Sequence, residues 1–197
     1  MTQFAQQIAF LQEIEKLKAV YRQTTVLADN DRSENSAEHS WHIALVAHVL
    51  RPYANGEVQI ERVIMMLLIH DIVEVDAGDT FAFADDVDMD AQSQQELLAA
   101  KRIFGLLPAE QGQPLIELWH EFELAESADA EFAKAMDRIL PLMQNMANDG
   151  GSWARHTVSK SKVLERNRYL QESAPRLWQY ACEQIDIAVA NGWLTDN

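Results

Sequence analysis

The sequence predicts an all-α fold, a single-domain helical bundle. Apolar residues recur three and four positions apart along most of the chain, which is the spacing of one helix face. No segment shows the sustained alternation of apolar and polar residues that a half-buried strand requires. The chain has 197 residues, with seven glycines, five prolines and no internal repeat or low-complexity linker. This length suits one domain, which we expect to span residues 1–197.

The first helix is predicted over about residues 4–17, where apolar residues step by three and four. Residues 21–35 lose that period and are polar, so we expect a loop there. Ser36 is a suitable N-cap for a second helix that runs to about Leu50, because its hydroxyl can accept a hydrogen bond from an early helical N–H.

A third helix is predicted over about residues 60–75. Its segment 63–69 is apolar throughout, so we expect it to be buried on most sides. Gly78 and the acidic run 85–88 predict the next loop. Pro141 lies inside a later helix and is expected to kink or interrupt it. The remaining helices are predicted over residues 90–107, 108–125, 128–148, 159–173 and 175–191.

The composition is that of an ordinary globular protein, with 48% hydrophobic and 24% charged residues. Cys182 is the single cysteine, which excludes a disulfide framework and fits a reducing cytoplasm. The first residues lack the basic start and apolar block of a signal peptide. The longest apolar run is far shorter than the roughly 18 residues that cross a bilayer. We therefore expect a soluble, cytoplasmic protein without a membrane partner.

The formal net charge is −15, from 31 acidic and 16 basic residues. Such a surface repels nucleic acid polymers, whose binding needs clustered lysine and arginine. A small phosphate ester is not excluded, because a metal and one or two arginines can reverse the potential inside a pocket. The charge thus disfavours a nucleic acid partner but allows small-anion chemistry.

Two histidines and two aspartates form the most informative pattern in the chain: His39, the neighbours His70 and Asp71, and Asp137. Imidazole nitrogens and carboxylate oxygens suit first-row divalent metals better than calcium. A structural zinc site is usually closed by cysteines, of which this chain has one. If the four side chains converge, the metal keeps open positions for water and substrate. A hydrolase is therefore the first hypothesis.

His70 and Asp71 are neighbours on a predicted helix, so their side chains point about 100° apart. They can share a metal only at the helix edge, near its C-terminal end. A histidine beside an apolar helix is often a hydrogen-bonded core residue. A buried aspartate, however, is costly unless it is paired or coordinated. The adjacent pair therefore favours a metal site over core packing.

The order of these residues resembles the H…HD…D signature of the HD-domain phosphohydrolase superfamily. Within it, the chain resembles the branch of bacterial 5′-deoxynucleotidases and the HD-domain-containing protein 2 group. The likeness covers a core of about residues 17–148, and we expect the C-terminal helices, residues 155–193, to pack on it. A lone His-Asp pair would carry no weight, whereas an ordered set of motifs is specific. The matching segments are Glu38-His39-Ser40-Trp41, His70-Asp71-Ile72-Val73-Glu74, Gly78-Asp79-Thr80, Leu118-Trp119-His120-Glu121-Phe122-Glu123 and Met136-Asp137-Arg138.

The resemblance implies that His39, His70, Asp71 and Asp137 are the metal ligands. One divalent ion is expected, with Mn, Co, Fe, Ni, Zn or Mg as the candidates. Binuclear HD enzymes add histidines between the His-Asp pair and the last aspartate, and here only His120 lies in that interval. Such a metal would polarise a phosphoryl oxygen as a Lewis acid.

Two further carboxylates are candidates for catalysis. Glu74 lies four residues after His70 and three after Asp71, so we expect it on their helix face, where it could orient or deprotonate the attacking water. The alternative is a solvated glutamate near a helix end. The resemblance places Asp79 close to the metal-bound water or the substrate, as a general acid or base. Alternatively, Asp79 caps its turn through Thr80.

The resemblance also implies that Arg22 binds the substrate phosphate, whose oxygens suit a guanidinium fork. The alternative is an exposed loop arginine. Gln23 follows where related nucleotidases have an aromatic residue, so their sugar and base preference does not carry over. Arg166 and Arg168 are also candidates for phosphate, although salt bridges on a helix surface are the expectation for both.

Two segments have no assigned role at this stage. Residues 150–156 are expected to form a flexible loop, with a lid or a substrate wall as its possible function. His120 and Glu121 are candidates for supporting the ligands, for the pocket mouth or for an interface. Relatives are commonly dimers, and the apolar first and last helices offer an interface, so we expect a homodimer.

The sequence thus predicts a metal-dependent phosphohydrolase that acts on a small phosphomonoester, with a (deoxy)nucleoside 5′-monophosphate as the expected substrate. One alternative is a phosphodiesterase for a cyclic nucleotide or a nucleotide second messenger. The lack of additional metal histidines and of a regulatory domain weighs against it. The other alternative is a non-catalytic, nucleotide-binding HD protein, which the presence of all four ligands and Glu74 disfavours.

Overall fold

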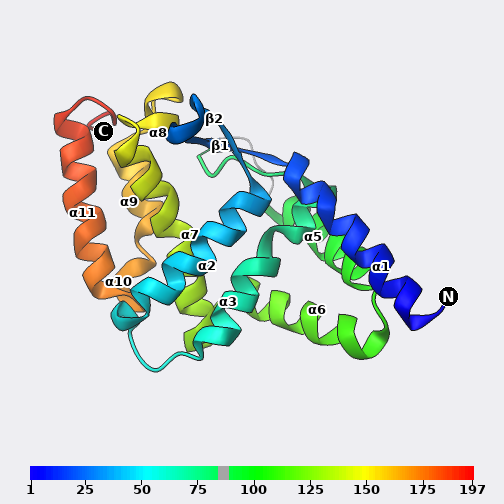
Figure 1. The fold of residues 1–197 in the computed structure, drawn as a ribbon. Helices are drawn as coiled ribbons and strands as arrows, with labels where there is room; N and C mark the ends of the chain where they lie inside the picture. The colour runs from blue at the N-terminus through cyan, green and yellow to red at the C-terminus, as the bar shows by residue number, and fades with distance from the viewer. Residues whose placement is uncertain (84–88) are drawn as a thin grey trace.

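The computed structural model describes residues 1–83 and 89–197 and confirms the predicted all-α fold (Figure 1). The acidic run 85–88, predicted to lie in a loop, is outside the described residues. The helices are α1 (Gln3–Ile14), α2 (Ser36–Leu50), α3 (Ile60–Ile69), α4 (Glu74–Ala77), α5 (Met89–Phe104), α6 (Ala109–Leu124), α7 (Ala128–Ala147), α8 (Gly151–Arg155), α9 (Lys160–Asn167), α10 (Leu170–Ser173) and α11 (Pro175–Ala190). Short 3-10 helices cover Glu15–Ala19, Leu27–Asp29, Arg51–Tyr53 and His70–Val73, and strands β1 (Tyr21–Val26) and β2 (Arg32–Asn35) form one sheet.

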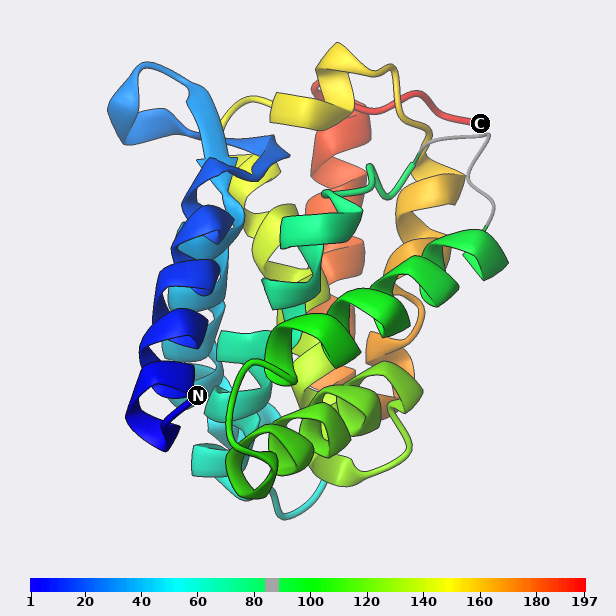
Figure 2. The same cartoon turned by 90° about the vertical axis from the view of Figure 1, so that its right-hand side faces the viewer.

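Helix α7 lies at the centre of the bundle. It is in contact with α2, α3 and α6 and with the C-terminal helices α9, α10 and α11 (Figure 1). Its buried side chains include Phe132, Met136, Ile139 and Leu140, so α7 supplies much of the apolar core. Helices α5 and α6 lie against each other as a pair beside α1 (Figure 2). Within the described residues, no helix has both the length and the apolar character of a membrane span.

Helix α3 is less buried than its apolar run predicts. Val63, Met66 and Leu67 are fully buried, but Met65 and Leu68 are 43% and 41% exposed. The predicted single helix over residues 60–75 is also divided, because α3 ends at Ile69 and a 3-10 turn follows. The carbonyl of His70 accepts a hydrogen bond from the Trp119 indole N–H at 3.2 Å, which replaces its helical partner.

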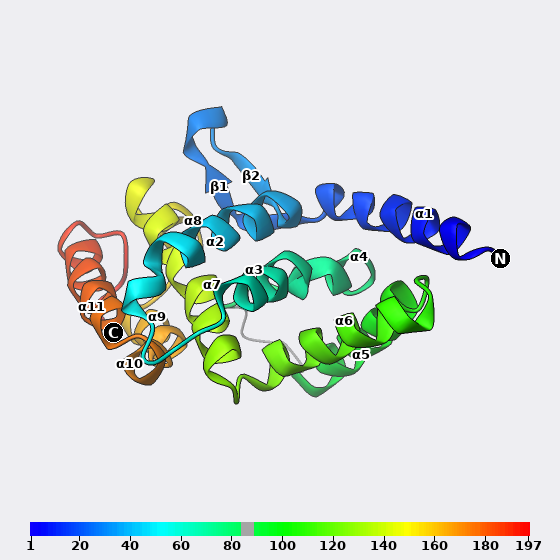
Figure 3. The ribbon, with the colours of Figure 1, turned by 60° about the horizontal axis from the view of Figure 1, so that its bottom comes forward.

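The predicted loop over residues 21–35 is instead an antiparallel hairpin, which extends from the start of α2 (Figure 3). Thr24 and Glu34 are buried and Arg22 is half-buried, whereas Tyr21 and Gln23 are exposed. The strand alternation is therefore present, but its buried face carries polar and charged side chains. A search for alternating apolar residues misses such a strand.

The N-cap of α2 is Asn35 rather than Ser36, which was the expectation. The Asn35 side chain accepts a hydrogen bond from the Glu38 backbone N–H at 3.0 Å, and Glu38 accepts one from the Asn35 N–H at 3.3 Å. This capping box satisfies two N–H groups at the helix start. Ser36 is then the first helical residue, and its hydroxyl is free to bind elsewhere.

Residues 150–156 form a short helix, α8, rather than the expected flexible loop. Ser152 and Trp153 are buried, and Asn145 Oδ1 accepts hydrogen bonds from Ser152 N at 2.7 Å and Oγ at 2.9 Å. At Gly151, φ is +41° and a Cβ would lie 2.6 Å from Asn145 Oδ1, so the close approach requires glycine. Helix α7 continues through Pro141, whose carbonyl accepts a hydrogen bond from Asn145 Nδ2 at 2.8 Å.

The orientation of α3 can be tested with two adjacent methionines. We expect Met66→Ala to lower the free energy of unfolding by about 2–5 kcal/mol, because it empties a packed core position. Met65→Ala should stay within about 0.5 kcal/mol of the wild type, because its side chain is partly in water. Urea denaturation followed by circular dichroism measures both. Equal losses would contradict the rotation of α3 described above.

Candidate metal centre

Three elements that contact one another bring the predicted ligands together. His39 lies in the first half of α2, His70 and Asp71 open the 3-10 turn after α3, and Asp137 lies in the middle of α7. His39 is fully buried, and His70 and Asp71 are 5% and 7% exposed. The end of α3 at Ile69 places the His-Asp pair at a helix edge, as a shared metal requires.

The ligand atoms are close enough to share one ion. His39 Nε2 lies 3.0 Å from Asp137 Oδ1, and His70 Nε2 lies 3.7 Å from the same oxygen. The ligand atoms of His39, His70 and Asp137 all lie within 4.8 Å of one another. Asp71 joins the group through its Oδ1, which is 2.9 Å from His70 Nε2. The structure therefore brings three of the four predicted ligands within reach of one ion and places Asp71 beside one of them, His70.

The surroundings of His70 fit a bound cation. Its Nδ1 lies 2.8 Å from the Leu67 carbonyl oxygen, and because a carbonyl can only accept, Nδ1 carries the proton. In the neutral ring, Nε2 is then a lone pair that faces the oxygens of Asp71 and Asp137. Among the described residues, this buried nitrogen has no hydrogen-bond partner. A lone pair among carboxylate oxygens is repelled unless a positive charge lies between them.

The pKa shifts of His70 and Asp137 also indicate that the site favours positive charge. Burial acts to lower the pKa of His70, but the charges of Asp71 and Asp137 outweigh it and raise that pKa well above its usual range. Burial acts to raise the pKa of Asp137, yet its interactions with His39 and His70 hold that pKa well below its usual range. The cluster therefore favours a proton on His70 or a divalent metal in its place.

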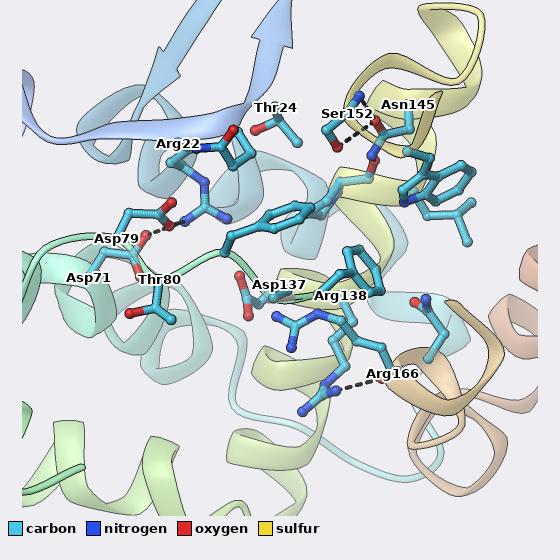
Figure 4. A pocket seen from close by; sticks show the side chains of 18 of the residues that line it. Arg22, Thr24, Asp71, Asp79, Thr80, Asp137, Arg138, Asn145, Ser152 and Arg166 are labelled. Carbon is cyan, nitrogen blue, oxygen red and sulfur yellow. Dashed lines mark hydrogen bonds and ion pairs between the residues drawn. The ribbon is translucent and has the colours of Figure 1, made fainter. Parts of the chain in front are cut away.

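Arg22 enters the centre from β1. Its Nη1 lies 3.1 Å from Asp71 Oδ2 and 3.6 Å from Asp79 Oδ1 (Figure 4). Only 14% of its side chain is exposed, so it is not the exposed loop arginine that the sequence left open. The hairpin thus places a guanidinium directly beside a predicted metal ligand.

Glu34 belongs to the centre, although no motif in the sequence points to it. It is 3% exposed, and its Oε2 lies 3.5 Å from His39 Nδ1 and 3.8 Å from Arg22 Nε. Its oxygens also accept hydrogen bonds from Thr24 Oγ1 at 3.1 Å and Gln144 Nε2 at 2.7 Å. A carboxylate on the far nitrogen of a ligating histidine orients the ring and makes it a stronger ligand. Glu34 lies in the segment taken for a loop, which hid it.

Glu74 and Asp79 lie beside the ligands. Ser36 Oγ donates a hydrogen bond to Glu74 Oε2 at 2.5 Å. Burial raises the pKa of Glu74 to about 9, with the charge of Asp71 adding to the effect. Burial also raises the pKa of Asp79, against the charge of Arg22. A divalent cation nearby would add positive charge and lower both values.

One pocket is lined by Arg22 and by the carboxylates of Asp71, Glu74, Asp79 and Asp137. Its free volume is about 770 Å³, with the solvent at its mouth included. Arg138 and Arg166 also line it, which corrects the expectation that Arg166 forms a surface salt bridge (Figure 4). Arg168 does behave as expected, with Nη1 3.7 Å from Glu165.

His120 and Glu121 are not among the described residues that line this pocket. His120 is exposed on α6, and Glu121 accepts a hydrogen bond from Ser127 Oγ at 2.6 Å and pairs with Arg62. Their assignment as supports for the ligands has no contact in its favour.

An aromatic cluster closes one side of the pocket. The Phe81 ring centroid lies 4.5 Å from that of His156 and 5.6 Å from that of Phe83. His156 Nε2 lies 3.1 Å from Gln23 Oε1, and Arg155 donates to the Gln23 carbonyl at 2.5 Å. Trp153 lines the pocket, and the two contacts of Arg155 and His156 tie the segment that follows it to the strand carrying Arg22.

Comparisons with known proteins agree with this geometry. The human protein named 5′-deoxynucleotidase HDDC2 is 31% identical over 137 residues, which cover 70% of this chain and 65% of the human protein. A 5′-deoxynucleotidase of Klebsiella pneumoniae is 30% identical, with 89% of this chain and 94% of that protein covered. A crystal structure from Magnetospirillum magnetotacticum, described as a predicted metal-dependent phosphohydrolase, has a TM-score of 0.91 and 46% identity. That likeness covers 98% of this chain and 95% of that chain.

The family model for the HD domain matches residues 14–178, which include all four ligands, Arg22, Glu74 and Asp79. The match takes in the hairpin, the central helices and most of the C-terminal helices. By this match, and by the relatives above, the chain belongs to the HD domain family.

Proposed function

We propose that this protein is a metal-dependent phosphohydrolase that releases phosphate from a (deoxy)nucleoside 5′-monophosphate. The observation that carries the proposal is the contact of Arg22 Nη1 with Asp71 Oδ2 at 3.1 Å. Through it, a guanidinium suited to phosphate adjoins the group of His39, His70, Asp71 and Asp137. The names of the human and Klebsiella relatives support the substrate class.

Each side chain has a role that follows from its position. One divalent metal, held by the four ligands, would supply Lewis-acid activation of the phosphoryl oxygen. Arg22 binds the phosphate oxygens through its fork. Glu74, which Ser36 holds in place, orients the attacking water and accepts its proton. Asp79, whose Oδ1 lies 3.6 Å from the same Nη1 of Arg22 that contacts Asp71, would handle the proton of the leaving group.

The aromatic wall supports a nucleotide over a simple sugar phosphate. The rings of Phe81 and Phe83 offer flat apolar surface in the pocket, and His156 packs against Phe81. A nucleobase gains by stacking on such rings, whereas a sugar phosphate has no flat face to offer. This wall differs from the aromatic residue that related nucleotidases have at the position of Gln23.

The two alternatives have less support. A binuclear diesterase needs further histidines, but the described residues contain one His-Asp group, and His120 is exposed on α6. A non-catalytic binder would not need Glu74 and Asp79 buried beside the ligands. A screen for phosphate release from nucleotides and sugar phosphates, with Mn, Co, Mg, Ni and Zn supplied separately, tests the proposal and identifies the metal.

A single domain, a cytoplasmic location and a homodimer also remain proposals. The dimer is supported by exposed apolar side chains on α1, where Phe4 and Leu11 are 72% and 58% exposed. Light scattering of the purified protein measures the oligomeric state directly.

Asp137→Ala should remove metal and activity together while helical content stays nearly unchanged. Asp137 Oδ1 lies close to the Nε2 atoms of both His39 and His70, so the variant lacks an oxygen ligand that the ion would need. Metal analysis of the purified variant and circular dichroism measure the two effects. The control is Asp186→Ala, which removes a carboxylate of α11 that pairs with Lys160 of α9. Wild-type metal content in Asp137→Ala would remove Asp137 from the site.

Arg22→Ala should raise KM and also lower kcat, because the guanidinium would hold the phosphate more tightly in the transition state. The matched control is Arg32→Ala on the other strand of the hairpin, where Arg32 pairs with Glu38 on the surface. Steady-state kinetics on a nucleoside 5′-monophosphate compare the two variants. Equal behaviour of both would show that Arg22 does not bind the phosphate.

Glu74→Gln should keep metal content and nucleotide binding while turnover falls by roughly 10²–10⁴-fold. Glutamine preserves the shape and the contact with Ser36 but cannot accept a proton. Glu61→Gln, an exposed position on α3, is the control. Unchanged turnover would make Glu74 a bystander and Asp79 the preferred base. Loss of metal would make Glu74 a ligand.

A further inference from the structure

The positive charge of Arg22 is already matched by protein carboxylates. Its guanidinium lies 3.1 Å from Asp71, 3.6 Å from Asp79 and 3.8 Å from Glu34. These contacts fix its orientation and compensate its charge. A phosphomonoester dianion that binds here therefore needs further positive charge beyond Arg22 and the metal.

Arg138 and Arg166 are the other arginines of the pocket, and they lie on the far side of Asp137 from Arg22 (Figure 4). Among residues 1–83 and 89–197, neither arginine forms an ion pair with a carboxylate. The chain has 31 acidic and 16 basic residues. Two arginines that share one pocket and pair with no carboxylate therefore favour an anionic ligand there.

Arg138 holds the segment that carries Arg166. It follows Asp137 on α7, and its Nη1 donates a hydrogen bond to the Arg166 carbonyl at 2.5 Å. Its guanidinium carbon lies 5.6 Å from the centroid of the Tyr169 ring, and its buried Nε has no hydrogen-bond partner. Arg138 thus ties α9 to the helix that carries a metal ligand.

Arg166 lies near the end of α9 and lines the pocket. Burial lowers the pKa of its guanidinium, the negative charge of Asp137 acts to raise that pKa, and the positive charge of Arg22 lowers it further. The guanidinium is therefore close enough to Asp137 and Arg22 to interact with both. An anion bound between Arg22 and Arg166 would therefore lie beside Asp137, where the metal group also is.

We propose that Arg166 is a second phosphate-binding residue, which holds the reacting phosphate from the side opposite Arg22, and that Arg138 positions it. The inference rests on the proposed function, because it assumes that the phosphate binds at the His-Asp group. A monoester dianion has one more negative charge and one more terminal oxygen than a diester. Arg166 supplies the matching charge and donors, so it selects monoesters over diesters.

The first test measures binding of inorganic phosphate to the metal-loaded protein by calorimetry. Arg166→Gln should weaken phosphate binding roughly 10- to 100-fold, the loss expected for a charge-assisted hydrogen bond. Arg166→Lys keeps the charge but not the fork, so its affinity should be intermediate. Arg168→Gln, which removes a surface partner of Glu165 two residues further on, should bind like the wild type. Metal content and melting temperature should be unchanged in all three variants.

The second test compares a nucleoside 5′-monophosphate with bis(p-nitrophenyl) phosphate, a diester. Arg166→Gln should lower kcat/KM for the monoester roughly 10- to 100-fold and lower the diester value much less. A structural role would lower both alike. Arg138→Met should also lower kcat/KM for the monoester, but by less. Arg166 is still present in this variant, whereas the hydrogen bond from Arg138 to its carbonyl is lost.

Wild-type phosphate affinity in Arg166→Gln would overturn the proposal. So would a loss confined to substrates with a second phosphate, such as a nucleoside 3′,5′-bisphosphate, because Arg166 would then bind a different group. If the wild type binds phosphate but hydrolyses no monoester, the proposed function fails, and the calorimetric comparison still decides the role of Arg166.

Discussion

A buried concentration of negative charge is the constraint on which the rest of this structure depends. Five carboxylates lie around two imidazoles and one guanidinium: Glu34, Asp71, Glu74, Asp79 and Asp137. Charges of one sign cannot be buried together without compensation, because the interior screens them poorly. Arg22 supplies part of the compensation, and a cation at the histidines supplies the rest. The apolar core around α7 keeps these groups in place against their mutual repulsion.

The irregular elements of the fold serve this centre. The 3-10 turn after α3 brings His70 and Asp71 to a helix edge, and Trp119 stabilises the break by binding the His70 carbonyl. The hairpin brings Arg22 and Glu34 inward from the two strands of one small sheet. His39 and Asp137 come from the regular helices α2 and α7. The neighbours His70 and Asp71 would point about 100° apart on a regular helix, so the irregular turn is needed to bring both to the same site.

The sequence was sufficient for the features that follow from residue type and order. Helical spacing predicted the fold class, and α2 spans the predicted residues 36–50. The order of His39, His70–Asp71 and Asp137 predicted four side chains that do converge. It was insufficient where burial contradicts polarity, as at Glu34 and the hairpin, because a buried charged face resembles a solvated loop in sequence. It was also insufficient for Arg166, whose place in the pocket depends on a backbone contact with Arg138.

The acidic character of the chain and an anionic substrate are compatible because the potential in the pocket differs from that of the surface. Several arginines outside the pocket lie beside carboxylates, as Arg32 does with Glu38 and Arg102 with Asp76. In the pocket, Arg138 and Arg166 form no ion pair with a carboxylate of the described residues. A surface of net charge −15 repels anions at long range, but salt screens that repulsion beyond about 10 Å. Binding is then decided at short range, by the guanidinium groups of the pocket and by a cation at the histidines, which together offset the carboxylates there.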